Sequence, residues 1–139
     1  MFGDAIDYAR VRIVHGKWIF FQPRRTVMAP MGHIHCHPKG DSWRDDFAAG
    51  SIGDQGLFIH EMTHVWQHQR GIFLPIARHP FCSYRYRLDA KRAFESYGIE
   101  QQAEIVRHAW MHRQGLTVPD KPGREAYEAL LPFPYHPTA

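Results

Sequence analysis

Two histidines and a glutamate lie within one turn of an apolar helical pattern in the stretch LFIHEMTHVWQHQRG, residues 57–71. Residues four apart on an α-helix are rotated by only about 40° from each other, so His60 and His64 project from one face and can bind one ion. Glu61 lies about 100° round the helix from His60, beside the open position of such an ion. A carboxylate there can accept a proton from a zinc-activated water. The spacing therefore predicts a zinc site with His60 and His64 as ligands and Glu61 as general base.

A third ligand is expected from the segment YGIEQQAEIVRH, residues 97–108, where Glu100 and Glu104 share one helix face. In zinc peptidases that use a glutamate ligand, the two carboxylates of such a pair have different roles. The first carboxylate binds the metal, and the acid four residues on accepts a hydrogen bond from the far nitrogen of a ligand histidine. We expect Glu100 as the ligand and Glu104 as its supporting carboxylate. The reverse assignment is one alternative, and His108 as the third ligand is another.

The chain has 139 residues, 44% of them hydrophobic and 22% charged, which favours one globular domain over residues 1–139. No apolar stretch is long enough to cross a bilayer, so no transmembrane segment is expected. The first residues, MFGDAIDYARVRIV, have no basic n-region, apolar h-region or small-residue cleavage site. We therefore expect synthesis in the cytoplasm without a signal peptide, and any export by another route.

The two cysteines, Cys36 and Cys82, are too few for a disulfide framework. The net charge of +3 raises the question of nucleic-acid binding, but the basic residues are scattered along the chain. A mildly basic solvated surface explains this charge equally well, so no nucleic-acid partner is expected.

The elements that must position these residues form an α+β pattern. Short strands are expected at residues 11–14, 17–21, 27–28 and 33–36, together a small N-terminal sheet. A helical turn is expected at residues 43–48. The firmest prediction is a helix over residues 54–69, with Ser51 and Asp54 as N-cap candidates and Gly71 as its stop.

The second half of the chain contributes one further long helix. Residues 72–86 contain two prolines and are expected to be irregular, and a helix is predicted over residues 99–114. Residues 117–139 are expected to form a linker, a short helix at residues 124–131 and a loose tail. The predicted architecture is a compact α+β domain in which two main helices hold one zinc ion.

Other side chains could also take part in chemistry. His33, His35 and His37 would share one side of a strand and could hold a second metal, but an edge strand that lies beside a bound peptide is the favoured interpretation. His68, one turn beyond His64, is expected at the surface or in contact with a ligand. The donors that could stabilise an oxyanion or contact substrate are His79, Tyr84 and Tyr86.

Three sequence blocks carry a family resemblance: LFIHEMTHVWQHQ, the Tyr-x-Tyr-x-Leu segment at residues 84–88, and YGIEQQAEIV. Over residues 5–107 the chain resembles the zincin-like proteins related to VgrG, and the metallopeptidase domains at the C-termini of some type VI secretion spike proteins. The resemblance implies a zincin-like fold with His60, His64 and Glu100 as zinc ligands and Glu61 as the catalytic base. It further implies an antibacterial effector that acts in the envelope of a target cell.

The expected function is therefore a zinc-dependent peptidase that hydrolyses a peptide or amide bond and is linked to type VI secretion. Its partners would be a peptide or protein substrate, a secretion spike and an immunity protein, and its destination the periplasm of a target cell. One alternative is a non-catalytic accessory protein of a secretion apparatus, in which zinc only holds the two helices together. Another is a zinc-dependent amidase that acts on cell-wall peptides.

Overall fold

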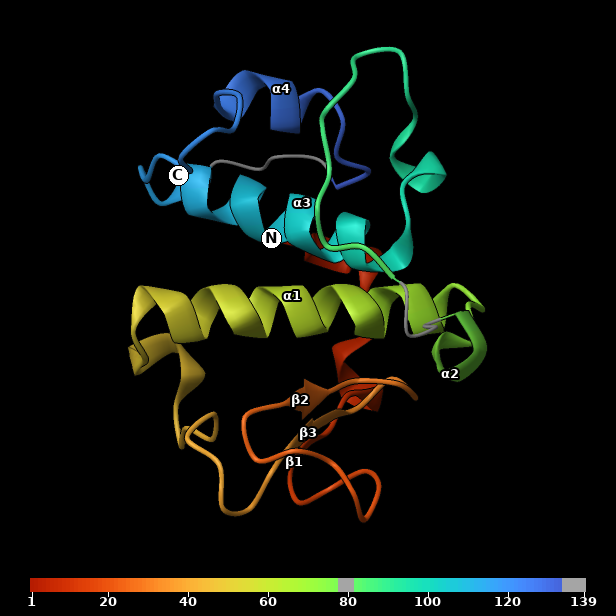
Figure 1. The fold of residues 1–139 in the computed structure, drawn as a ribbon, viewed down its shortest axis with the longest axis vertical. Coiled ribbons are helices and arrows are strands. Elements are labelled where there is room, and N and C mark those ends of the chain that lie inside the picture. The colour runs from red at the N-terminus through yellow and green to blue at the C-terminus, as the bar shows by residue number, and fades with distance from the viewer. Residues whose placement is uncertain (78–81, 134–139) are drawn as a thin grey trace.

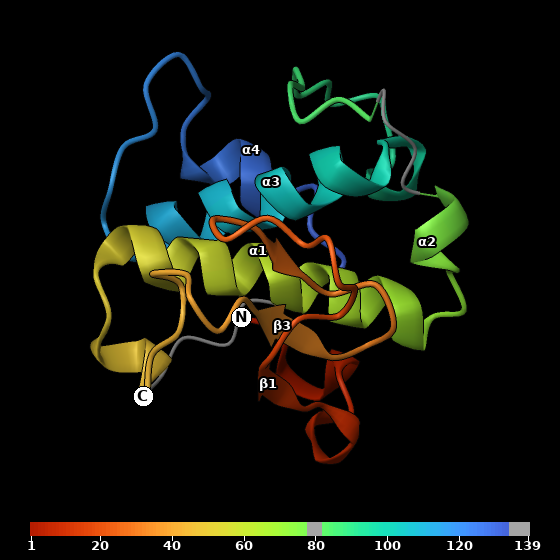
Figure 2. The same ribbon diagram turned by 60° about the horizontal axis from the view of Figure 1, so that its bottom comes forward.

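The computed structural model describes residues 1–77 and 82–133. A long helix, α1 (Ile52–Gln69), lies in the middle of the molecule. A small sheet covers one side of α1, and α3 (Ile99–Arg113) covers the other side, with α4 (Arg124–Glu128) packed on α3 (Figure 1). Figure 2 shows the same three layers from another side. This arrangement confirms the expected α+β class.

The sheet contains three short strands in the order β1-β3-β2, namely β1 (Ile13–His15), β2 (Val27–Met28) and β3 (Ile34–Cys36). β1 runs parallel to β3, and β2 runs antiparallel to it. β3 is therefore the central strand, and the interpretation of this segment as an edge strand is wrong. Ile34 and Cys36 are buried, whereas His35 between them is only half-buried, as the alternation of side chains along a strand requires.

The strand predicted at residues 17–21 is also wrong, because this segment forms a turn. The buried Gln22 side chain accepts a hydrogen bond from the Trp18 amide at 2.9 Å and donates to the carbonyl of His35 at 3.1 Å. The amide of Gln22 donates to the carbonyl of Ile19. These contacts close residues 18–22 into a loop attached to β3, and they override the β propensity of the aromatic run.

The predicted first helix is confirmed as α1, which begins two residues earlier than expected. Ser51 and Asp54 form a capping box: the Ser51 hydroxyl accepts from the Asp54 amide, and the Asp54 carboxylate accepts from the Ser51 amide. At the other end Gly71 has a φ of +89°, a conformation in which glycine is favoured. Ser51 is therefore the N-cap and Gly71 follows the end of the helix as predicted, whereas Asp54 is the third residue of the helix and the partner of Ser51 in the capping box.

The predicted second helix is confirmed as α3, and it ends one residue earlier than expected. The irregular segment after α1 contains a short helix, α2 (Leu74–Ala77), and the C-terminal helix α4 ends at Glu128 rather than at residue 131. Single 3₁₀ turns, including one that replaces the turn expected at residues 43–48, complete the helical elements: Gly3–Ala5, Tyr8–Arg10, Phe47–Ala49 and Phe94–Ser96.

The contact between α1 and α3 is the most extensive contact between two elements of residues 1–77 and 82–133. Val65 from α1 and Ile105, Val106 and Ala109 from α3 are completely buried. The aromatic ring of Phe133 packs against both Phe2 and Trp66, so that one hydrophobic cluster joins both ends of the described chain. None of the helices described is both long enough and apolar enough to span a bilayer.

We predict that Trp110→Ala lowers the free energy of unfolding by about 3–5 kcal/mol, because its buried ring contacts α1 at Gly56 and its loss leaves a cavity between α1 and α3. Urea denaturation of the zinc-free protein measures this change. Leu116→Ala, at a side chain that is 36% exposed, serves as the control and should change the stability little. Equal stabilities of the two variants would show that the α1–α3 contact does not hold the fold together.

Candidate metal centre

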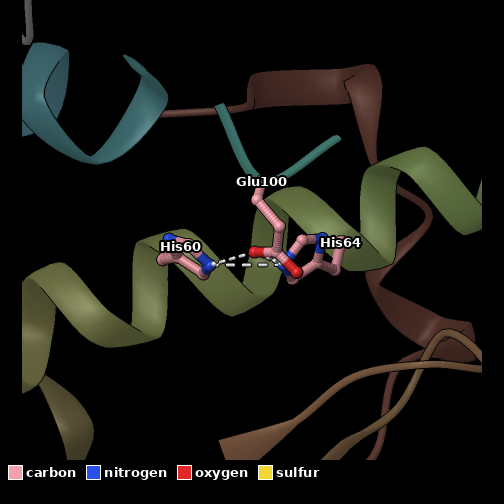
Figure 3. A group of neighbouring side chains, drawn as sticks. All are labelled: His60, His64 and Glu100. Carbon is pink, nitrogen blue, oxygen red and sulfur yellow. Dashed lines mark hydrogen bonds and ion pairs between the residues drawn. The ribbon is translucent and has the colours of Figure 1, made fainter. Parts of the chain in front are cut away.

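His60, His64 and Glu100 point toward one another from α1 and α3 (Figure 3). The Nε2 atoms of the two histidines are 3.2 Å apart, and each lies 3.2 Å from Oε2 of Glu100. All three residues are buried, and the Glu100 side chain has no exposed surface. The structure therefore brings together the two histidines and the first of the two glutamates that the sequence indicated.

These distances fit a metal ion. Zinc binds histidine nitrogen and carboxylate oxygen at about 2.0–2.2 Å, so neighbouring ligands in a tetrahedral site lie about 3.3–3.5 Å apart. The three observed separations of 3.2 Å agree closely with that spacing. Two imidazoles and one carboxylate are also the ligand set of many catalytic zinc sites. His60, His64 and Glu100 form the only metal-sized group of this kind that we find in residues 1–77 and 82–133.

Glu104 holds the ring of His60 in place. Its Oε1 lies 2.8 Å from Nδ1 of His60. Because a carboxylate only accepts hydrogen bonds, Nδ1 carries the proton and donates it, which leaves Nε2 of His60 directed at the cluster. In this geometry Glu100 faces the cluster and Glu104 contacts the far nitrogen of His60, the positions expected for a ligand and its supporting carboxylate.

Gln67 holds the ring of His64 in place, a role that was not predicted from the sequence. Nδ1 of His64 donates to Oε1 of Gln67 at 2.8 Å. The amide orientation of Gln67 is fixed, because its Nε2 donates both to the carbonyl of Ile99 and to Oε1 of Gln102 at 2.9 Å. Since Oε1 can only accept, His64 must carry its proton on Nδ1 and present Nε2 to the cluster. The only sequence signal was a glutamine three residues after a ligand histidine.

The charges around His60 favour its protonated form when no metal is bound. Burial lowers its pKa, but hydrogen bonds with Glu100 and Glu104 and the negative charge of Glu61 outweigh burial and raise this pKa to about 9. The pKa of Glu104 is lowered: burial acts to raise it, and the hydrogen bond and charge of His60 more than compensate. A metal ion would therefore replace a proton at His60.

Glu61 occupies the sheet side of α1, next to His60 in sequence but outside the ligand set. It is only 5% exposed and lines a narrow cavity between α1 and the sheet together with Ile34, Cys36 and Phe58. Burial and, to a smaller extent, the charge of Glu61 raise the pKa of the Cys36 thiol to about 11. The charge of Glu61 thus acts on both the buried thiol and His60, although Glu61 is not part of the group formed by His60, His64 and Glu100.

A larger cavity opens next to His64. Its volume is about 350 Å³, and its walls come from the loop after β1, from β2 and the residues that follow it, and from α2. The lining residues other than His64 are Trp18, Phe21, Met28, Ala29, Pro30, Leu74 and Pro75. The cavity therefore reaches one of the three cluster residues, His64.

The remaining predicted contact residues lie in different places. The ring of Tyr84 stacks on His60 with centroids 6.0 Å apart. The hydroxyl of Tyr86 instead contacts His108 Nδ1 at 2.5 Å and the hydroxyl of Tyr127 at 2.6 Å, on the far side of Glu104. His108 Nε2 lies 3.6 Å from Oε2 of Glu104, and His108 is not part of the group formed by His60, His64 and Glu100. His79 falls outside the described residues.

The other histidine cluster does not assemble. No second metal-sized group that includes His33, His35 or His37 exists in the part of the chain that the structure describes. His68 packs over Gly32, where a Cβ atom would lie 2.6 Å from the imidazole. Cys36 and Cys82 are both free thiols, the first of them buried.

We predict a graded loss of zinc affinity. Glu100→Gln should lose most of the affinity, because it removes a ligand charge, whereas Glu104→Gln and Gln67→Ala should each weaken binding about 10- to 100-fold by releasing an imidazole. Competition with a chromophoric chelator measures the three constants. Gln114→Ala, at an exposed position, is the matched control. A Gln67→Ala protein that binds zinc as tightly as the control would remove the role assigned to Gln67.

The raised pKa of His60 also predicts how the metal-free protein responds to pH. The folded state retains a proton between pH 6.5 and about 9 that the unfolded chain releases, so stability should be highest below pH 6.5 and fall as the pH rises through 9. Urea midpoints of chelator-treated protein test this, and His60→Asn should flatten the dependence. The stabilisation by added zinc should increase over the same window, because the metal displaces that proton. A metal-free protein that gains stability toward pH 9 would contradict this description.

Known proteins resemble this chain closely. No family model matches it. The chain is 41% identical over 123 residues to the type VI secretion system spike protein VgrG2b of Pseudomonas aeruginosa, a match that covers 81% of this chain but only 12% of that protein.

The solved structure of the effector domain of Pseudomonas aeruginosa VgrG2b matches this fold with a TM-score of 0.72 and 34% sequence identity. The match covers 91% of this chain and 72% of that one. Because both the sequence and most of the fold are shared with this domain, the chain belongs to the family of the VgrG2b effector domain.

Proposed function

We propose that this chain is a zinc-dependent peptidase and acts as a type VI secretion effector. The observation that supports this most directly is the buried cluster of His60, His64 and Glu100, with ligand atoms 3.2 Å apart and Glu61 on the same helix. The family membership supports the role as an effector. We propose both the peptidase activity and the zinc ion from the geometry of this cluster.

Each side chain then has a separate task. His60, His64 and Glu100 would hold the ion through Nε2, Nε2 and a carboxylate oxygen. When bound, zinc would supply Lewis acidity that lowers the pKa of a water toward about 7 and polarises the carbonyl of a substrate amide. Glu61 would accept the proton of the attacking water and return it to the leaving amine, which needs a base outside the ligand set. Glu104 and Gln67 would keep the two imidazoles oriented throughout.

The cavity beside His64 favours catalysis over a purely structural metal. A structural zinc site has four protein ligands and no open position. Here three protein groups form the cluster, and the space next to His64 is about 350 Å³ with mostly apolar walls. That volume is within the range of small-ligand sites and admits part of a peptide.

The target compartment follows from the proposed delivery. A type VI effector that cleaves envelope proteins or cell-wall peptides would act in the periplasm of the target cell. An immunity protein would then protect the producing cell in the same compartment. The two substrate classes share the amide bond that the site would hydrolyse.

We predict that Glu61→Gln abolishes toxicity while zinc content and fold stay nearly unchanged, because it removes the base and no ligand. Wild type and variant are expressed in bacteria, either in the cytoplasm or directed to the periplasm, and growth and bound zinc are measured. Glu95→Gln, at an exposed glutamate, is the matched control and should stay as toxic as wild type. We expect toxicity in the periplasm only.

A zinc-replete Glu61→Gln protein that inhibits growth as strongly as wild type would contradict the catalytic role. Equal behaviour of both proteins, together with zinc bound by four side chains, would instead support a non-catalytic accessory protein.

A further inference from the structure

The charge of the chain is concentrated in its sheet region. Between Asp7 and Asp41 the sequence contains no acidic residue and six basic ones, whereas the rest of the chain has 11 basic and 14 acidic residues. All six side chains are exposed. They are Arg10, Arg12, Lys17, Arg24, Arg25 and Lys39. Residues 8–40, which contain the sheet, therefore carry six positive charges and no negative one, although the whole chain has a net charge of only +3.

Large apolar side chains are exposed in the loop after β1, after β2 and around α2. Phe20 is 83% exposed and Phe21 64%, and Ile76 in α2 is 79% exposed. Trp18, Met31 and Phe73 are also exposed. The loop and α2 face each other, because both line the cavity beside His64. We call these six apolar residues together with the six basic ones the aromatic-basic face.

The loop that carries the two phenylalanines is held in place. The amide of Trp18 and the side chain of Gln22 close it onto β3, as described above, and Lys17 Nζ donates to the carbonyl of Phe20 at 2.9 Å. The rings of Phe20 and Phe21 contact each other edge to face at 5.0 Å rather than packing into the core. These hydrogen bonds therefore hold the loop in a position in which both aromatic rings are exposed.

Three of the basic groups surround the base of this loop. Gly40 approaches the carbonyl of Arg24 so closely that no Cβ atom would fit there, which brings Lys39 next to Arg24. Lys17 lies at the same loop, because its Nζ donates to the carbonyl of Phe20. Lys17, Arg24 and Lys39 thus lie near the loop that carries the exposed aromatic side chains.

We propose that the aromatic-basic face binds the surface of an anionic lipid bilayer. Aromatic side chains favour the interface between headgroups and acyl chains, and lysine and arginine at the same depth contact anionic headgroups. Single exposed apolar residues are ordinary, but a contiguous patch bordered by one sign of charge is typical of an interaction surface. An anionic membrane complements both parts of this face at once.

The chemistry of the face favours lipid over nucleic acid. Single-stranded nucleic acid stacks its bases on open aromatic faces, and the edge-to-face pair of Phe20 and Phe21 presents no parallel platform. Ile76 and Met31 offer no ring to stack on, whereas both suit the acyl boundary. The proposal goes beyond the peptidase function and does not depend on it. The shared cavity means that docking would place the opening beside His64 next to the bilayer.

The test is co-sedimentation of the full chain with vesicles of phosphatidylcholine and phosphatidylglycerol in equal amounts, compared with vesicles of phosphatidylcholine alone. We expect binding to the anionic vesicles and at least tenfold weaker binding to the neutral ones, because each basic residue near the surface contributes about a fivefold factor. High salt should weaken the binding further. The double variants Phe20→Ser with Phe21→Ser, and Arg24→Glu with Arg25→Glu, should each lose at least tenfold.

Matched controls lie on the α3 side of the molecule, away from the sheet (Figure 1). Leu116→Ser replaces an exposed apolar residue, and the double variant Arg87→Glu with Lys91→Glu removes the same charge as the Arg24 and Arg25 pair. Both should bind the vesicles as wild type does. Circular dichroism and zinc content show that each variant is folded, and Glu61→Gln should bind normally because docking is separate from catalysis.

The proposal would be overturned by a wild-type chain that does not bind the anionic vesicles, or by binding that survives either face variant. Binding of a mixed-sequence single-stranded oligonucleotide, lost in the same variants and without any vesicle binding, would assign the face to nucleic acid instead.

Discussion

The packing of α3 across α1 sets the distance between Glu100 and the two histidines, and the rest of the site depends on it. The two helices approach closely at Gly56 of α1, where a Cβ atom would lie 3.2 Å from Nε of Arg107 and 3.7 Å from the ring of Trp110. Because protein interiors are close-packed, this contact allows little sliding of one helix along the other. Glu100 lies in the first turn of α3 and meets Nε2 of both histidines there. A shift of one residue would move the carboxylate round the helix and away from the cluster.

Buried polar groups surround this contact, and their hydrogen bonds maintain the arrangement. Leaving a buried carboxylate or imidazole without partners would cost several kcal/mol, so Glu104 and Gln67 stabilise the fold and orient the ligands at the same time. Gln67 bridges from α1 to the carbonyl of Ile99, directly before Glu100. The same hydrogen bonds that fix the tautomers of the histidines therefore also tie the start of α3 to α1.

The pairs of site residues that lie on one helix could be predicted from the sequence. The four-residue spacing alone places His60 with His64, and Glu100 with Glu104, on their helix faces. The role of Gln67 could not be predicted, because its partners are 32 and 35 residues away and meet it only after the helices pack. The turn at residues 17–21 has the same origin, since the contact between Gln22 and the carbonyl of His35 outweighs local propensity. The central position of β3 likewise follows from pairing with both β1 and β2.

Anomalous diffraction at the zinc edge from crystals of the zinc-loaded chain would locate the metal and its ligands directly. We predict one zinc ion, bound by Nε2 of His60, Nε2 of His64 and a carboxylate oxygen of Glu100, with a fourth position that no side chain of the protein occupies and that faces the cavity beside His64. Zinc bound elsewhere, or zinc held at this site by four side chains, would contradict this prediction.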